Sequence, residues 1–196
     1  MRRLIASSAL LLSLALTSLV PPAHATTVLK VDVSQMTTMS EWVVRARVTA
    51  VENIVKAADG EGPFTDVHLA IDEVYRGPAG TAPARTLVVR LMGGAMGNGL
   101  AMKVPGMPRF KVGEEAVLFL EKTTLGFVPC GLEQGVWRII KGPFGYEVVQ
   151  QTVLDLNLVT RSADGKLTQD AHHHGPRRAS KLLGALAAEI RAAAPR

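Results

Sequence analysis

The sequence of 196 residues has a single cysteine, Cys130, and few aromatic side chains, which make up 5% of the chain. One thiol forms no disulfide within a chain, so apolar packing must hold the fold together. Hydrophobic residues supply 47% of the sequence, enough for a core. Cys130 stands in the apolar segment 127–131, so we expect a buried thiol, with intermolecular pairing or a reactive thiol as the alternatives.

Clustered positive charge is also scarce. The formal net charge is +5 at pH 7, but the cations are scattered until the C-terminal segment, which holds Arg177, Arg178, Lys181, Arg191 and Arg196. A nucleic-acid interface needs lysine and arginine gathered on one face. We therefore expect no nucleic-acid partner, and we interpret the C-terminal cations as a solvated helix face rather than a contact to an anionic envelope surface.

The motifs of catalytic sites are missing as well. The sequence has no Gly-x-Ser-x-Gly and no His-Glu-x-x-His, and the glycine-rich stretch 93–99 lacks the lysine of a phosphate-binding loop. Asp66 and His68 are two residues apart on a predicted strand and could pair as a base and its orienting group, but no nucleophile accompanies them. The sequence thus predicts a protein that is not an enzyme and needs no cofactor.

The first 25 residues have the pattern of a secretory signal peptide. Two arginines follow Met1, an apolar run extends from Leu4 to Val20, and Ala23-His24-Ala25 ends the segment. We expect cleavage after Ala25, which leaves one domain, 26–196, in the periplasm or outside the cell. A retained membrane anchor is the alternative, but serine and threonine interrupt the run, and a spanning helix needs roughly 20 apolar residues. No later segment is apolar enough to span.

Alternation of apolar and polar residues predicts that most of the remaining chain is β-structure. The period of two is clear at 44–49 and at 65–72, and the continuous apolar run 116–120 is typical of a strand buried on both faces. A break in the alternation near Ala50 predicts a bulge. Strands are expected at 41–55, 65–75, 86–91, 116–120, 127–130, 136–140, 146–149 and 153–159.

Helices are expected only at the two ends of the domain. Ser34 is a candidate cap for a short helix that carries Met36 and Met39. From Arg178 to Ala194, an apolar stripe at helical spacing predicts a helix docked on the sheet through Leu182, Leu183, Leu186 and Ile190.

Three segments in this order resemble the netrin-like domain of tissue inhibitors of metalloproteinases and complement proteins: Ser40–Val48, Val74–Gly77 and Phe110–Leu120. The resemblance implies an OB-like antiparallel barrel over 40–140, with Gly77 and Gly113 relieving the backbone at tight turns. In those inhibitors an N-terminal cysteine chelates the protease zinc. Here Thr26 would be the mature N-terminus, so the resemblance implies the fold without the inhibition. The layout is also similar to exported bacterial proteins of unknown role.

The connection 92–112 is rich in glycine and proline and carries Met92, Met96, Met102 and Met107. We expect a mobile segment over the barrel mouth, because methionine suits adaptable contacts. The sequence predicts a binding module that recognises a protein or envelope component here, with help from Arg45, Arg47 and His68. Copper(I) binding by the thioethers is the weaker interpretation, since their spacing is irregular.

His172, His173 and His174 form the other candidate site. Imidazoles bind zinc, nickel or copper, and Asp170 is close in sequence. Adjacent side chains on an extended segment diverge, so a closed site needs ligands from elsewhere. Periplasmic copper or zinc binding through these histidines is therefore kept as the alternative function.

Overall fold

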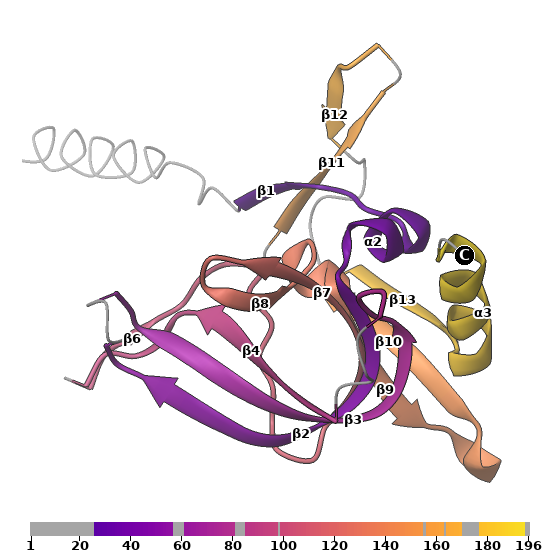
Figure 1. Cartoon of the computed structure of the whole chain (residues 1–196). Helices are drawn as coiled ribbons and strands as arrows, with labels where there is room; N and C mark the ends of the chain where they lie inside the picture. The colour runs from indigo at the N-terminus through magenta and orange to yellow at the C-terminus, as the bar shows by residue number, and fades with distance from the viewer. Residues whose placement is uncertain are drawn as a thin grey trace, which may run out of the picture.

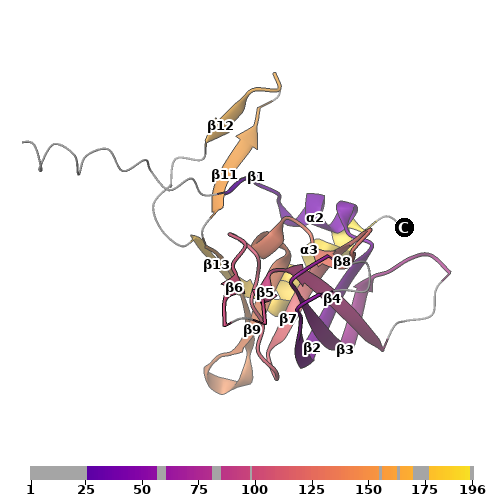
Figure 2. The same ribbon diagram turned by 90° about the vertical axis from the view of Figure 1, so that its left-hand side faces the viewer.

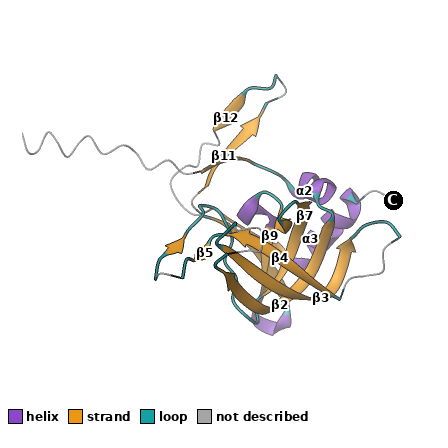
Figure 3. Cartoon of the chain, turned by 60° about the vertical axis from the view of Figure 1, so that its left-hand side comes forward, coloured by secondary structure: helices purple, strands orange, loops and turns teal. Residues whose placement is uncertain are grey.

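The computed structural model describes residues 26–56, 61–80, 85–97, 99–154, 156–162, 164–169 and 177–194. Most of these residues lie in strands, with one short helix near the start and another at the C-terminal end (Figure 1, Figure 3). This confirms the predicted mostly β fold with a helix at each end.

A ring of strands forms the barrel. β2 (Trp42–Ile54) pairs with β3 (Phe64–Arg76) on one side and with β7 (Glu115–Thr123) on the other, and β3 pairs with β4 (Thr86–Met92). β8 (Gly126–Pro129) closes the ring, since it is antiparallel to β7 and meets β4 through one parallel pair. The order β7-β2-β3-β4-β8 is that of an OB-like barrel, as predicted.

Further strands extend the barrel sheet, and the remaining described strands form two small sheets. β9 continues outward from β7, followed by β10 and β13, while β1, β11 and β12 form a small sheet that stands away from the barrel (Figure 2). The bounds of these strands are β1 Thr26–Leu29, β5 Gly94–Ala95, β6 Ala101–Met102, β9 Val136–Lys141, β10 Glu147–Val153, β11 Leu156–Arg161, β12 Leu167–Gln169 and β13 Arg177–Leu182. Two short 3-10 helices, η2 (Leu132–Gly135) and η3 (Pro143–Gly145), lie between them.

β2 serves two cores because its side chains alternate between the two faces of the sheet. Val44, Ala46 and Val48 fill the barrel, whereas Val43 packs in a second cluster beneath the helices. The pairing with β3 shifts register three times along β2, and the shift between Val48 and Ala50 is the predicted bulge. The run 116–120 in β7 is buried on both faces, also as predicted.

The helices α2 (Val33–Met39) and α3 (Leu183–Ala193) pack against each other and against the sheet. Two predictions about them were wrong. The cap of α2 is Asp32 rather than Ser34, since the Asp32 carboxylate accepts the Gln35 N–H at 2.8 Å. Residues before Leu183 are in β13, where pairing with β10 satisfies their backbone, so Leu182 is exposed and lies outside the buried stripe of α3.

The two glycines of the resemblance have different roles. Gly113 adopts a φ of +87°, the left-handed conformation expected at a tight turn. Gly77 does not. Instead, a Cβ at Gly77 would lie 2.7 Å from the Trp42 ring, so this glycine makes room for a buried indole.

No helix within the described ranges has the length and apolar character needed to cross a membrane.

Gln134 fastens the N-terminal strand to the barrel. Its buried side-chain amide accepts the Val31 N–H and donates to the Leu29 carbonyl, both at 3.0 Å. These are the bonds that a neighbouring strand would make, and they leave β1 paired with β11 on its other side.

We expect Gln134→Ala to destabilise the domain by about 1–2 kcal/mol, because it leaves two backbone groups without partners. Amide hydrogen exchange at residues 27–31 should accelerate more than exchange in the barrel strands. Gln150→Ala on β10 is the control and should change little. Unaltered exchange in β1 of the Gln134 variant would show that β11 alone holds the strand.

Candidate functional site

Two hollows meet at one end of the barrel, and Met92 and Met107 line both. The first, called the β8 hollow, has a volume of about 300 Å³. It is lined mainly by apolar groups from β4, β7, β8 and the turns around them: Met92, Met107, Glu121, Thr123, Thr124, Leu125, Val128, Pro129, Gly131 and Leu132. Methionines beside other apolar lining groups suit an adaptable contact with an apolar side chain of a partner.

The second, called the hairpin hollow, has a volume of about 410 Å³ and lies beneath the β5–β6 hairpin. Met102 joins the two shared methionines in its lining, with Val51, Asn53, Thr65 and Leu91 on the strand side. Phe110 lines it too, from a position where the ring is 9% exposed and belongs to the barrel core.

The sequence predicted a mobile connection at 92–112 without packed elements, but the structure packs it against the barrel at several points. Thr65 Oγ1 donates to the Gly93 carbonyl at 2.9 Å, and Asn53 Oδ1 accepts the Ala95 N–H at 3.4 Å. Phe110 is anchored in the core because the barrel end leaves space for a large apolar group. The backbone at Gly93 and Ala95 is therefore bonded to β3 and β2.

Close packing of the hairpin depends on Gly93. Its φ is +98°, and a Cβ there would lie 2.7 Å from the Met102 carbonyl oxygen. A glycine is thus required where β4 passes into β5 against the backbone of β6. The close approach brings Met92 and Met102 to the same hollow, although ten positions separate them in the sequence.

Exposed apolar side chains gather around the hairpin. Met92, Met96 and Met102 are 44%, 43% and 39% exposed, and Leu100 at the hairpin turn is 63% exposed. Val55 at the end of β2 joins them, since a Cβ at Gly97 would be 3.4 Å from its side chain. We call Val55, Met92, Met96, Leu100 and Met102 the methionine patch. Exposed apolar side chains gathered in this way are typical of interaction sites.

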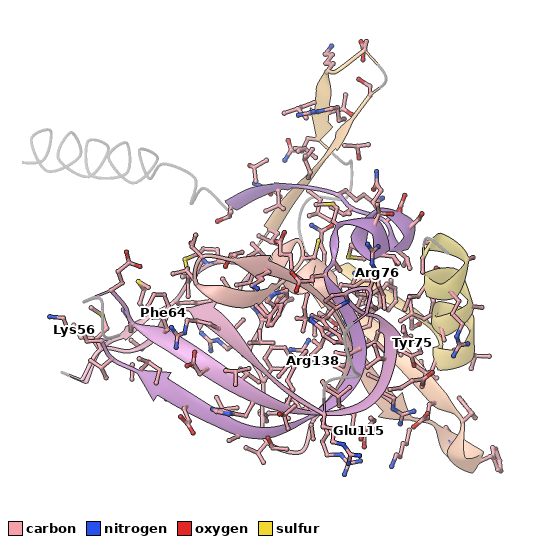
Figure 4. The ribbon with its side chains drawn as sticks, in the orientation of Figure 1. Lys56, Phe64, Tyr75, Arg76, Glu115 and Arg138 are labelled. Carbon is pink, nitrogen blue, oxygen red and sulfur yellow. The ribbon has the colours of Figure 1, made fainter. Side chains whose placement is uncertain are left out.

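The structure does not bring Arg45 and Arg47 to the methionine patch. Phe64, which pairs with Met92, lies at the far end of the long strands from Glu115, which binds both arginines (Figure 4). Arg45 forms two hydrogen bonds with Glu147, at 2.7 and 2.9 Å, and one with Glu115 at 3.1 Å. The hydrogen bond with Glu147 is the main cause that raises the pKa of Arg45, despite an opposing effect of burial.

Asp66 and His68 do not pair with each other. Asp66 is 8% exposed and forms two hydrogen bonds with Arg90, at 2.8 and 2.7 Å, while Arg90 lies over the Phe64 ring. His68 Nε2 is 3.4 Å from Glu52 on the neighbouring strand. The arrangement is that of separate cross-strand pairs rather than a base with its orienting group.

Cys130 is buried and free, as expected. Its side chain belongs to the cluster beneath the helices, and burial is the main cause that raises the thiol pKa to about 11. The thiolate is the reactive form of cysteine, so burial and the raised pKa both disfavour reaction at this residue.

The candidate metal site cannot be placed in the same way. His172, His173 and His174 lie outside the described residues, and among those described no group of three histidine, cysteine, aspartate or glutamate side chains is arranged to hold a metal ion.

Sequence reasoning missed the contribution of β8 to this site. Leu125, Val128 and Leu132 follow the methionines by 18 or more positions, and they reach them only because β8 closes the barrel against β4. The sequence did predict a strand at 127–130. It could not show that this strand pairs with β4, because that parallel pair joins residues far apart in the chain.

Comparison with protein-family models, curated proteins and solved structures gave no match for this chain.

Proposed function

We propose that this chain is an exported, non-enzymatic binding module that recognises a protein through the methionine patch and the two hollows beside it. The observation that carries the proposal is the position of Met92 and Met107 in the lining of both hollows. An extended segment of a partner could place neighbouring apolar side chains in the two hollows at once. Unbranched thioether side chains then adjust to the shape that arrives.

The packed base beneath the patch supports the same proposal. Anchored backbone at Gly93 and Ala95 holds the methionines near their binding positions, so less order must be imposed on binding. Export by the signal peptide, a location in the periplasm or outside the cell, and kinship with netrin-like domains stay predictions from the sequence. Metal binding through His172, His173 and His174 stays the alternative.

Replacing Met96 and Met102 together by serine should weaken partner binding by about tenfold or more, since two exposed apolar contacts are lost. A photo-crosslinking residue at position 100, between them, would capture the partner in cells, and mass spectrometry would identify it. Binding is then measured with the purified partner. The unfolding midpoint should hardly change, because both methionines are about 40% exposed.

Leu167→Ser on β12 is the matched control, as Leu167 is 54% exposed and lies in the small sheet away from the barrel. Equal affinity of the Met96 and Met102 double variant and the unchanged protein would contradict the proposal. So would equal crosslinking from positions 100 and 167.

A further inference from the structure

The hairpin of β9 and β10 carries an unusual tip. The two strands pair from Arg138 and Gln150 down to Lys141 and Glu147 and project beyond the rest of the sheet (Figure 1, Figure 2). The tip reads Gly142-Pro143-Phe144-Gly145-Tyr146. It is far along the chain from the methionine patch and shares no lining residue with either hollow.

Several contacts fix the backbone of this tip. Gly142 N–H donates to the Tyr146 carbonyl at 2.8 Å, and Gly145 N–H donates to the Gly142 carbonyl at 3.3 Å. The Tyr146 ring lies directly on Gly142, where a Cβ would be 2.4 Å from a ring carbon. Pro143 further restricts the turn. The tip is thus a preformed structure rather than a loose loop.

Phe144 is held at the end of this turn in a costly way. Its side chain is fully exposed, at 104% of the reference value, and its φ of 66° is in the left-handed region that bulky residues rarely adopt. An exposed ring and a strained backbone both disfavour phenylalanine in the isolated domain. Such strain is found where a residue serves an external contact.

The surroundings of Phe144 are apolar and cationic. Ile140 and Tyr146 are 46% and 47% exposed, and Val112, beside the groove that Gly113 and Ile140 line, is 66% exposed. Lys111, which precedes Val112 in sequence, and Lys141, which precedes Gly142, are both exposed. Three arginines balance the three nearby carboxylates in number: Glu115 binds Arg45 and Arg47, Glu147 binds Arg45, and Glu114 lies 3.9 Å from Arg138.

We propose that the β9–β10 tip is a membrane anchor, in which Phe144 enters the interface of an anionic lipid bilayer while Lys141 and Lys111 contact the headgroups. A stable protein interface covers about 800 Å² on each partner, whereas this tip is the narrow end of one projecting hairpin (Figure 1). A bilayer can surround such a tip on all sides. Stable attachment of this kind takes an apolar and an electrostatic component together, and this surface has both.

The proposal goes beyond binding at the methionine patch and does not depend on it. It would hold the domain at a membrane surface by one end while the barrel mouth, formed by other elements, binds its partner.

Vesicle flotation tests the anchor with the purified full chain. We expect binding to phosphatidylglycerol and phosphatidylethanolamine vesicles and weaker binding to phosphatidylcholine vesicles. Phe144→Asn should bind about tenfold more weakly, because the inserted ring is lost. Its Tm should be unchanged or higher, since asparagine tolerates a positive φ. Lys141→Gln should weaken binding to the anionic vesicles only. Leu167→Asn is the control for an exposed apolar residue elsewhere.

Equal vesicle binding by Phe144→Asn and the unchanged protein would overturn the proposal, as would the absence of vesicle binding by the unchanged protein. A lower Tm in Phe144→Asn would show that the ring stabilises the fold, which also contradicts the anchor. If vesicles are not bound but crosslinking from position 144 captures a protein, the tip contacts a protein instead, and the lipid assignment is wrong. The test at the methionine patch is unaffected by any of these results.

Discussion

Replacing Arg45 by methionine should lower the free energy of unfolding by about 2–3 kcal/mol near neutral pH, because hydrogen bonds to charged groups are lost and carboxylates are left partly buried. Arg45 joins Glu115 on β7 to Glu147 on β10 across the outer face of the sheet. The side chains of the three residues are 15–25% exposed, so solvent screens the charges only in part. Methionine preserves the apolar stem of the side chain, which isolates the effect of the charge.

The same substitution should change the pH dependence of stability. The hydrogen bond from Arg45 is the main cause that lowers the pKa of Glu115 below its ordinary value of 4.5. The stabilisation from this carboxylate is therefore complete above pH 4.5 and is lost as the pH falls through the lower pKa of the folded state. In Arg45→Met, less stability remains to be lost on acidification, so the two unfolding curves should converge at low pH.

Urea unfolding between pH 3 and pH 8 measures both effects. Arg47→Met is the matched control, because Arg47 also binds Glu115, at 3.2 Å, but is 53% exposed. Exposed ion pairs contribute about 0–1 kcal/mol. An equal loss of stability in both variants, or a constant difference between Arg45→Met and the unchanged protein at all pH values, would contradict this account.

Gly77→Ala should destabilise the domain by about 2–3 kcal/mol through overpacking. The added methyl group would lie 2.7–3.2 Å from three atoms of the Trp42 ring. Trp42 is 5% exposed and packs in the barrel core, so its ring has little room to move. The cost arises from this contact and not from the backbone, because the φ of Gly77 is not positive.

A double-mutant cycle with Trp42→Phe tests the cause. Phenylalanine lacks the indole atoms closest to Gly77, so the two substitutions together should cost less than the sum of their separate effects. Gly184→Ala in α3 is the control. No atom lies within 4 Å of its added methyl group, and alanine favours a helix, so stability should stay equal or increase. Strictly additive costs at positions 42 and 77 would exclude the steric explanation.

The strands could be predicted from the sequence because alternation reports directly on one-sided burial. β2, β3 and β7 show this, and even the bulge near Ala50 was visible. The cap of α2 and the first residue of α3 were harder to predict from the sequence. Leu182 fits the spacing of a helical stripe equally well, and only pairing with Val148 on β10 shows that it belongs to a strand.

The candidate site was predictable only as a list of methionines. Composition identified Met92 and Met102 as adaptable contacts, but it did not predict that Thr65 donates to the Gly93 carbonyl or that Asn53 accepts the Ala95 N–H. The tip of the β9–β10 hairpin could not be predicted as a contact site, because Phe144 looks like an ordinary turn residue in sequence. Its exposure and its φ become evident only in the structure.

β13 pairs with β10 along one side only, so its other edge is open within the described sheet. Open edges invite strand addition from other molecules, and charged side chains oppose it. Arg178 is exposed on this strand, and Lys181 is held over the Trp137 ring and bonded to Glu189. An exposed cation such as Arg178 opposes edge-to-edge pairing at this strand, and we expect that effect to matter more in a fold held by apolar packing alone, where no disulfide limits unfolding.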